Sequence, residues 1–79
     1  MADPRGCFDS WAEGKDDLQR SSLLEGLIDL ADRSLTELPG IRSTGRSPMS
    51  RWTLIESTVV VIHVYESQGW FDLVDLRDL

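Results

Sequence analysis

Apolar residues recur at steps of three and four between residues 16 and 38, which is the period of an amphipathic helix. The stripe consists of Leu23, Leu24, Leu27, Ile28, Ala31, Leu35 and Leu38. Two capping-box pairs compete for its start, Asp16 with Gln19 and Ser22 with Glu25. Pro39 and Gly40 follow the stripe and are residues that end helices. We therefore predict one long helix over residues 16–38.

The C-terminal half carries the pattern of β-strands. Residues 52–55 and 58–65 are dense in β-branched and aromatic side chains, and residues 70–76 form a third such run after a turn at 66–69. Both faces of the 58–65 run are apolar, so it is predicted to be the central strand. One helix covers only one face of this sheet. We therefore expect a homodimer that forms through the sheet, by its face or by its edge.

The rest of the chain gives weaker signals. Residues 6–11 are predicted to form a short edge strand, and the turn-rich residues 40–51 a weak strand followed by a loop. Seventy-nine residues suffice for one small domain. The prediction is a single α+β domain over residues 1–79, a two-layer sandwich in which one long helix packs on a mostly antiparallel β-sheet.

Composition narrows the classes of function. No apolar run approaches the roughly 20 residues of a membrane span, and the first residues lack the apolar region of a signal peptide. A single cysteine, Cys7, excludes an internal disulfide framework and a Cys-rich zinc site. We expect a cytoplasmic protein with no membrane contact and no bound metal, in which Cys7 is a small half-buried residue.

The charge is acidic overall but uneven. Fourteen acidic and eight basic residues give a net charge of −6, which disfavours direct binding of nucleic acid because phosphate contacts carry most of that affinity. Residues 38–55 are the exception, with Arg42, Arg46 and Arg51 and no acidic residue. This basic segment either meets an anionic ligand or partner, or is a solvated loop that offsets its acidic neighbours.

One segment suggests chemistry. Glu56, Ser57 and Thr58 stand just ahead of His63, and a hairpin of the flanking strands would place Ser57 at its tight turn. A serine on a strained turn near an imidazole can attack its own preceding carbonyl, an N-to-O acyl shift that leads to backbone cleavage. The spacing alone favours the plainer interpretation, in which Ser57 and Thr58 are turn residues and His63 packs in a strand.

Two groups of residues resemble a known family. The first comprises Asp9-Ser10-Trp11, Asp16, Leu18 and Leu23-Leu24-Glu25; the second comprises Glu56-Ser57, Ile62-His63, Tyr65, Gly69-Trp70 and Val74-Asp75. Together they resemble the N-terminal portion of the bacterial S-adenosylmethionine decarboxylases, the pyruvoyl enzymes of polyamine synthesis. The resemblance implies self-cleavage between Glu56 and Ser57 and a pyruvoyl group derived from Ser57. It also implies His63 as the processing residue and S-adenosylmethionine as substrate.

The chain departs from that family at several points. One extra residue separates Ser57 from His63, and Thr58 stands where the family has a histidine. The family's catalytic cysteine and the second half of its chain have no counterpart. The resemblance is therefore compatible with three kinds of protein: an active decarboxylase, an inactive relative of one, or a fragment.

A second resemblance covers the C-terminal half. Residues 52–56 and 60–65 align without a gap with a motif of the ribosome-silencing factors (Iojap-like proteins), and Trp70-Phe71-Asp72-Leu73 follow. This similarity implies a non-enzymatic protein that binds a protein of the large ribosomal subunit and blocks subunit joining. The connection after Tyr65 is about two residues shorter than in that family, and the family's first strand and helix are missing.

The sequence thus leaves three hypotheses: a decarboxylase-like protein, a ribosome-silencing factor-like protein and a non-catalytic dimeric interaction module. The sequence favours the first, because that resemblance accounts for the entry to the helix as well as for the strands.

Overall fold

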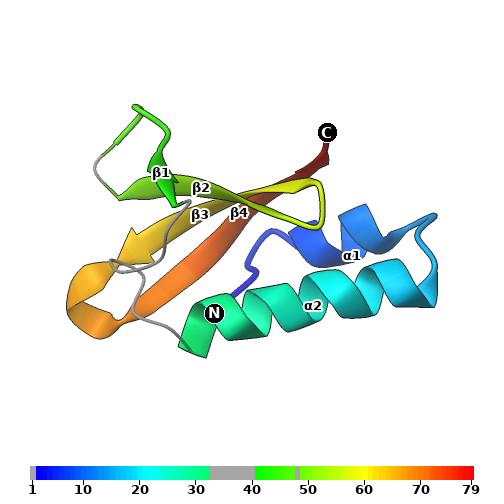
Figure 1. Ribbon diagram of the computed structural model, residues 1–79. Coiled ribbons are helices and arrows are strands. Elements are labelled where there is room, and N and C mark those ends of the chain that lie inside the picture. Colours follow the sequence, from blue (N-terminus) through cyan, green and yellow to red (C-terminus); the bar gives the residue numbers. More distant parts are fainter. Residues whose placement is uncertain (1, 33–40, 48) are drawn as a thin grey trace.

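The computed structural model describes residues 2–32, 41–47 and 49–79 (Figure 1). Its sheet has four antiparallel strands in the order β1-β2-β3-β4, which confirms the α+β class. The elements in chain order are α1 (Cys7–Ala12), α2 (Asp17–Asp32), β1 (Arg42–Ser43), β2 (Ser50–Ile55), β3 (Thr58–Tyr65), the 3-10 turn η1 (Glu66–Gln68) and β4 (Trp70–Asp78).

The strand β3 lies between β2 and β4, so the predicted central strand is confirmed. Its side chains alternate in burial along its whole length, beginning with buried Thr58 and half-buried Val59. The buried set faces the helices. The other set, together with the side chains of β2 and β4 that pair with it, forms what we call the open face.

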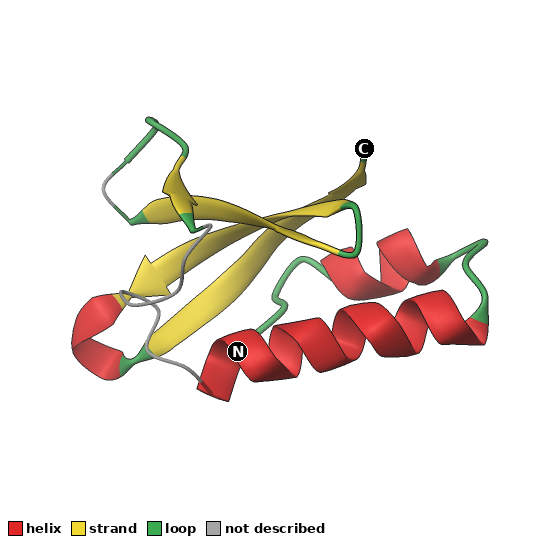
Figure 2. Ribbon diagram, viewed as in Figure 1, coloured by secondary structure: helices red, strands yellow, loops and turns green. Residues whose placement is uncertain are grey.

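The two helices lie against the same face of the sheet (Figures 1 and 2). One apolar core joins the layers, and α2 supplies Leu23, Leu27 and Leu30 to it. The sheet supplies Val60, Ile62, Val64, Phe71, Leu73 and Leu76. Among the described helices, none is long and apolar enough to cross a membrane.

The prediction of one long helix is wrong, because α2 has 16 residues and a separate short helix precedes it. The start of α2 does follow the predicted capping box. The Gln19 backbone N–H donates to the Asp16 carboxylate at 2.8 Å, and the Asp16 N–H donates to the Gln19 side-chain oxygen at 3.2 Å. The predicted C-terminal part, with Leu35, Leu38 and the Pro39-Gly40 stop, lies outside the described residues.

The buried stripe of α2 is narrower than predicted. Leu24 and Ile28 are 42% and 51% exposed, whereas Leu30, which was not assigned to the stripe, is 6% exposed. Leu23, Leu27 and Leu30 follow one line at steps of four and three. Leu24 and Ile28 each lie about 100° further around the helix axis, beyond the edge of the contact with the sheet.

The predicted edge strand over residues 6–11 is also wrong, since α1 occupies this segment. The Asp3 carboxylate accepts hydrogen bonds from the backbone N–H groups of Cys7 at 2.8 Å and Phe8 at 2.9 Å. These bonds satisfy donors that a helix N-terminus otherwise leaves free. Phe8 and Trp11, three residues apart, then pack together against the core.

Gly26 of α2 packs directly against Ile55 of β2. A Cβ built on it would lie 2.4 Å from the Cγ2 atom of Ile55. Alanine favours helices over glycine by about 1 kcal/mol, but overpacking costs roughly 1–3 kcal/mol. We therefore expect Gly26→Ala to lower the urea midpoint of unfolding. A raised midpoint would contradict the close contact between Gly26 of α2 and Ile55 of β2.

Candidate functional site

The turn between β2 and β3 consists of Glu56 and Ser57, as the sequence predicts for Ser57. Both residues are exposed and have positive φ angles, 51° and 65°. Left-handed backbone is costly for residues other than glycine. The backbone N–H of Leu79 donates to the Ser57 carbonyl at 3.1 Å, so the end of the chain lies against this turn.

The structure does not bring His63 to Ser57. His63 stands five residues along β3 from Thr58, about 17 Å at the rise of a strand. Its ring stacks on Tyr65 with centroids 4.9 Å apart. The His63 Nε2 atom is buried and makes no hydrogen bond to the described residues. The three predicted site residues therefore divide into the turn pair Glu56–Ser57 and a distant His63.

The aromatic side chains Tyr65 and Trp70 both bind Asp72, the residue that pairs with His63 on β4. The Tyr65 hydroxyl donates to Asp72 at 3.2 Å, and the Trp70 indole N–H donates to the same carboxylate at 3.4 Å. Desolvation, and then the bond to Asp72, raise the pKa of Tyr65 above its usual value. This end of the open face is thus an aromatic cluster around one carboxylate, far along β3 from the turn serine.

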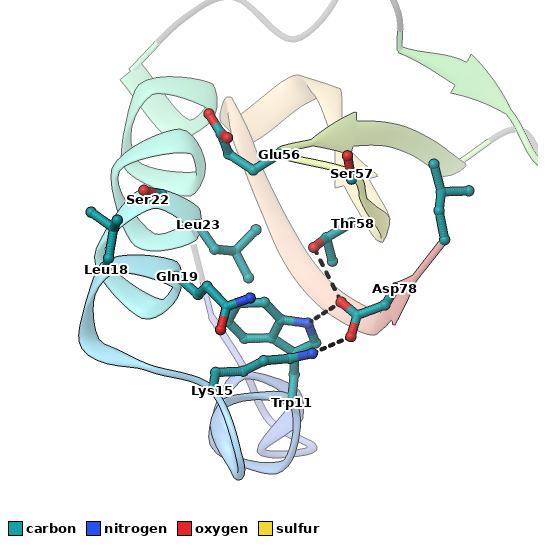
Figure 3. Close-up of a pocket in the computed structure, with 11 residues that line it drawn as sticks. Trp11, Lys15, Leu18, Gln19, Ser22, Leu23, Glu56, Ser57, Thr58 and Asp78 are labelled. Atoms are coloured by element: carbon teal, nitrogen blue, oxygen red, sulfur yellow. Dashed lines mark hydrogen bonds and ion pairs between the residues drawn. The ribbon is translucent and has the colours of Figure 1, made fainter.

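A hollow of about 400 Å³ lies next to the Glu56–Ser57 turn, between the two helices and the end of β4 (Figure 3). Its charged lining residues are Lys15, Glu56 and Asp78. The Asp78 carboxylate accepts hydrogen bonds from the indole N–H of Trp11 at 2.9 Å and from the Thr58 hydroxyl at 3.4 Å. It also forms an ion pair with Lys15, whose ammonium lies 5.4 Å from the Trp11 ring centroid.

These contacts lower the pKa of Asp78, first through the Lys15 and Trp11 hydrogen bonds. A lowered pKa in the folded state stabilises the fold above the unfolded value, near pH 4, and this contribution is lost as the pH falls through the folded value. We expect Asp78→Asn to unfold at lower urea than the wild type at pH 6–7, with the two converging below about pH 4. Glu25→Gln on the exposed side of α2 is the control. A gap that is constant with pH would contradict this role of Asp78.

Cys7 has a structural role in the described part of the chain. Its thiol donates to the Val74 carbonyl at 3.1 Å, and its side chain packs half-buried against the core. Burial, and then the nearby Asp3 carboxylate, raise the pKa of the Cys7 thiol. A thiol held in this way is a poor nucleophile. No group of three or more His, Cys, Asp or Glu side chains suited to a metal occurs among the described residues.

A larger hollow, of about 570 Å³, lies on the open face. We call it the arginine hollow, because Arg5, Arg46 and Arg77 line it together with Trp52 and valines of β3 and β4. Of the three arginines in the predicted basic segment, Arg46 alone lines it. Arg51 pairs with Ile62, whose side chain belongs to the helix-facing core.

Sequence reasoning missed this grouping because its arginines come from three separate parts of the chain. The N-terminal segment reaches the sheet through Ala2, which exchanges backbone hydrogen bonds with Phe71 and Leu73 of β4 at 3.2 and 2.8 Å. This attachment holds Arg5 near the last strand, where Arg77 stands. Nothing in the local pattern around Arg5 or Arg77 indicates that they meet.

No protein-family model, curated protein or solved structure matches this chain. The two family resemblances are therefore predictions that depend on the residues quoted for them and on how those residues lie in the fold.

Proposed function

We propose that this chain is a non-catalytic binding module of the ribosome-silencing type, which binds a protein of the large ribosomal subunit through the open face of its sheet. The observation that carries the proposal is the placement of the residues behind that resemblance. The segments 52–56 and 60–65 lie in one hairpin, with continuous pairing from Ser50 opposite His63 to Ile55 opposite Thr58. Trp70-Phe71-Asp72-Leu73 pair with the other side of β3.

The connection after Tyr65 is shorter than in that family, and it lies in an exposed turn where a change of length costs little free energy. The connection after Tyr65 is η1, a short 3-10 turn whose Ser67 and Gln68 side chains are exposed. Changes of length in exposed turns leave the paired strands intact and cost little free energy. The shorter connection is therefore compatible with the pairing of the strands on both sides of it. The proposed similarity to that family is limited to the sheet, because the helix α1 lies where the family has a strand.

The charge of the chain supports a protein as the partner. A net charge of −6 repels the phosphates of ribosomal RNA. The open face, in contrast, offers aromatic and apolar side chains, including Trp52 and Trp70, which are the residue types enriched in protein interfaces. The homodimer predicted from the sequence, which forms through a face or an edge of the sheet, is the competing use of this surface when it forms through the open face.

The test is sedimentation of the purified chain with isolated ribosomal subunits at physiological salt. We expect it to pellet with large subunits and to stay in the supernatant with small subunits. Analytical ultracentrifugation of the chain alone measures the competing homodimer. A chain that pellets with neither subunit and sediments as a tight dimer would support the dimeric interaction module.

A second candidate is self-cleavage of the decarboxylase kind, and the strained Glu56–Ser57 turn favours it. The Ser57 hydroxyl oxygen would bond to the Glu56 carbonyl carbon while the peptide C–N bond breaks, giving an ester and a free amine. Elimination from that ester would release the Glu56 carboxylate and leave dehydroalanine at position 57. Water would then hydrolyse its imine tautomer to the pyruvoyl group and ammonia, and the cleaved protein would take S-adenosylmethionine as its substrate. The distance to His63 gives no support to a processing role for that residue.

Intact mass of the purified protein measures this second candidate directly. Our main proposal predicts a single uncut chain for the wild type, for Ser57→Ala and for the control Ser67→Ala in η1. Fragments of residues 1–56 and 57–79 in the wild type and in Ser67→Ala, absent from Ser57→Ala, would instead establish self-processing.

A further inference from the structure

Three arginines gather on one side of an acidic chain. Arg5, Arg46 and Arg77 line the arginine hollow, in which the one acidic side chain among the lining residues is Asp75. Asp75 pairs with Arg77 at 2.5 Å. Arg5 and Arg46 form no ion pair with any residue that the structure describes. Two guanidinium groups are therefore available to a ligand, in a chain whose net charge is −6.

The floor of the hollow is apolar. Val59 and Val61 point to the open face from β3, and Trp52 stands opposite Val61 on β2. All three side chains are half-buried rather than exposed or enclosed. Cations around an apolar floor match a ligand that has an anionic group beside an apolar one. Guanidinium groups bind carboxylates and phosphates through paired hydrogen bonds.

We infer that the arginine hollow binds an acidic and apolar segment of the partner protein, with its carboxylates at Arg5 and Arg46 and an apolar side chain on the valine floor. This inference depends on the proposed function for the identity of that partner. The hollow is shallow, since its floor residues keep part of their surface exposed. A small molecule is usually buried over most of its surface in its site, so a protein segment that continues beyond the rim fits better.

Charge argues against a second copy as the occupant. A twofold axis through the arginine hollow would set the same arginines against each other, and like charges across an interface are costly. Nucleic acid is the other source of anions. Its extended line of phosphates would meet the acidic remainder of the chain beyond the hollow.

The experiment measures binding of a fluorescein-labelled Glu-Leu-Glu-Leu-Glu peptide by fluorescence anisotropy. Labelled Lys-Leu-Lys-Leu-Lys and a ten-nucleotide polyuridine are the comparison probes. Arg5→Glu and Arg46→Glu are the test variants. Arg20→Glu, at an exposed position of α2, makes the same charge change away from the hollow. Circular dichroism and the thermal midpoint establish that each variant is folded.

We expect the acidic peptide to bind more tightly than either comparison probe. Arg5→Glu and Arg46→Glu should each weaken its binding by about tenfold or more, while Arg20→Glu changes it by less than about twofold. Tighter binding of polyuridine, or equal losses in all three variants, would overturn the inference.

Sedimentation with large subunits separates this inference from the proposed function. Peptide binding that depends on Arg5 and Arg46, without sedimentation, would remove the ribosomal partner and leave the hollow as an acidic-peptide site. Sedimentation that Arg46→Glu does not weaken would retain the ribosomal partner and overturn the role of the hollow.

Discussion

Leu27→Ala is expected to lower the free energy of unfolding by roughly 2–5 kcal/mol, as for other fully buried leucines. Leu27 is 0% exposed and lies at the centre of the contact between α2 and the sheet. Its neighbour Ile28 is 51% exposed, so Ile28→Ala should cost less than about 1 kcal/mol. Urea unfolding followed by circular dichroism measures both differences.

The contrast between the two positions is the test of the helix face. A small domain has only about 5–15 kcal/mol of stability, so Leu27→Ala removes a large share of it. Leu27→Met keeps the side-chain volume and should remain folded. Equal costs for Leu27→Ala and Ile28→Ala would contradict the packing of α2 described here.

Phe71→Ala should destabilise the chain by about 3–5 kcal/mol. Phe71 is 1% exposed on β4, opposite Val64 of the central strand. The adjacent Trp70 is 42% exposed on the open face, and Trp70→Ala should cost less than about 1.5 kcal/mol, the net value of its hydrogen bond to Asp72. The same urea experiment compares the two substitutions.

The Phe71 and Trp70 pair tests the register of β4, because a shift by one residue would exchange their faces. If Phe71→Ala does not fold, Phe71→Leu provides the smaller change and should still cost more than Trp70→Ala. A larger loss for Trp70→Ala than for Phe71→Leu would mean that Trp70, and not Phe71, belongs to the core.

The strands could be predicted from the sequence because their signals are local. The β-branched run over residues 58–65 and the two-residue gap before it specify a central strand and a tight hairpin turn. The start of α2 was equally readable, since Asp16 and Gln19 form a reciprocal cap within four residues.

Structural features that depend on contacts between residues far apart in the sequence could not be predicted from local patterns. The segment of α1 has only two short apolar pairs, and its helix depends on capping by Asp3 and on packing of Trp11 near Asp78. The predicted buried face of α2 includes Leu24 and Ile28, which are exposed, and omits Leu30, which is buried. All three are apolar, so only the position of the sheet decides which of them is buried. The arginine hollow forms because the N-terminal segment pairs with β4. No local sequence pattern predicts this contact.

Binding to large ribosomal subunits by paired surface variants tests the central claim most directly. Leu54 and Leu24 are both exposed leucines, 50% and 42%, but Leu54 pairs with Val59 on the open face while Leu24 lies on α2. We predict that the wild type and Leu24→Lys sediment with large subunits and that Leu54→Lys does not. Failure of the wild type to sediment, or equal binding by Leu54→Lys, would contradict a partner on the open face.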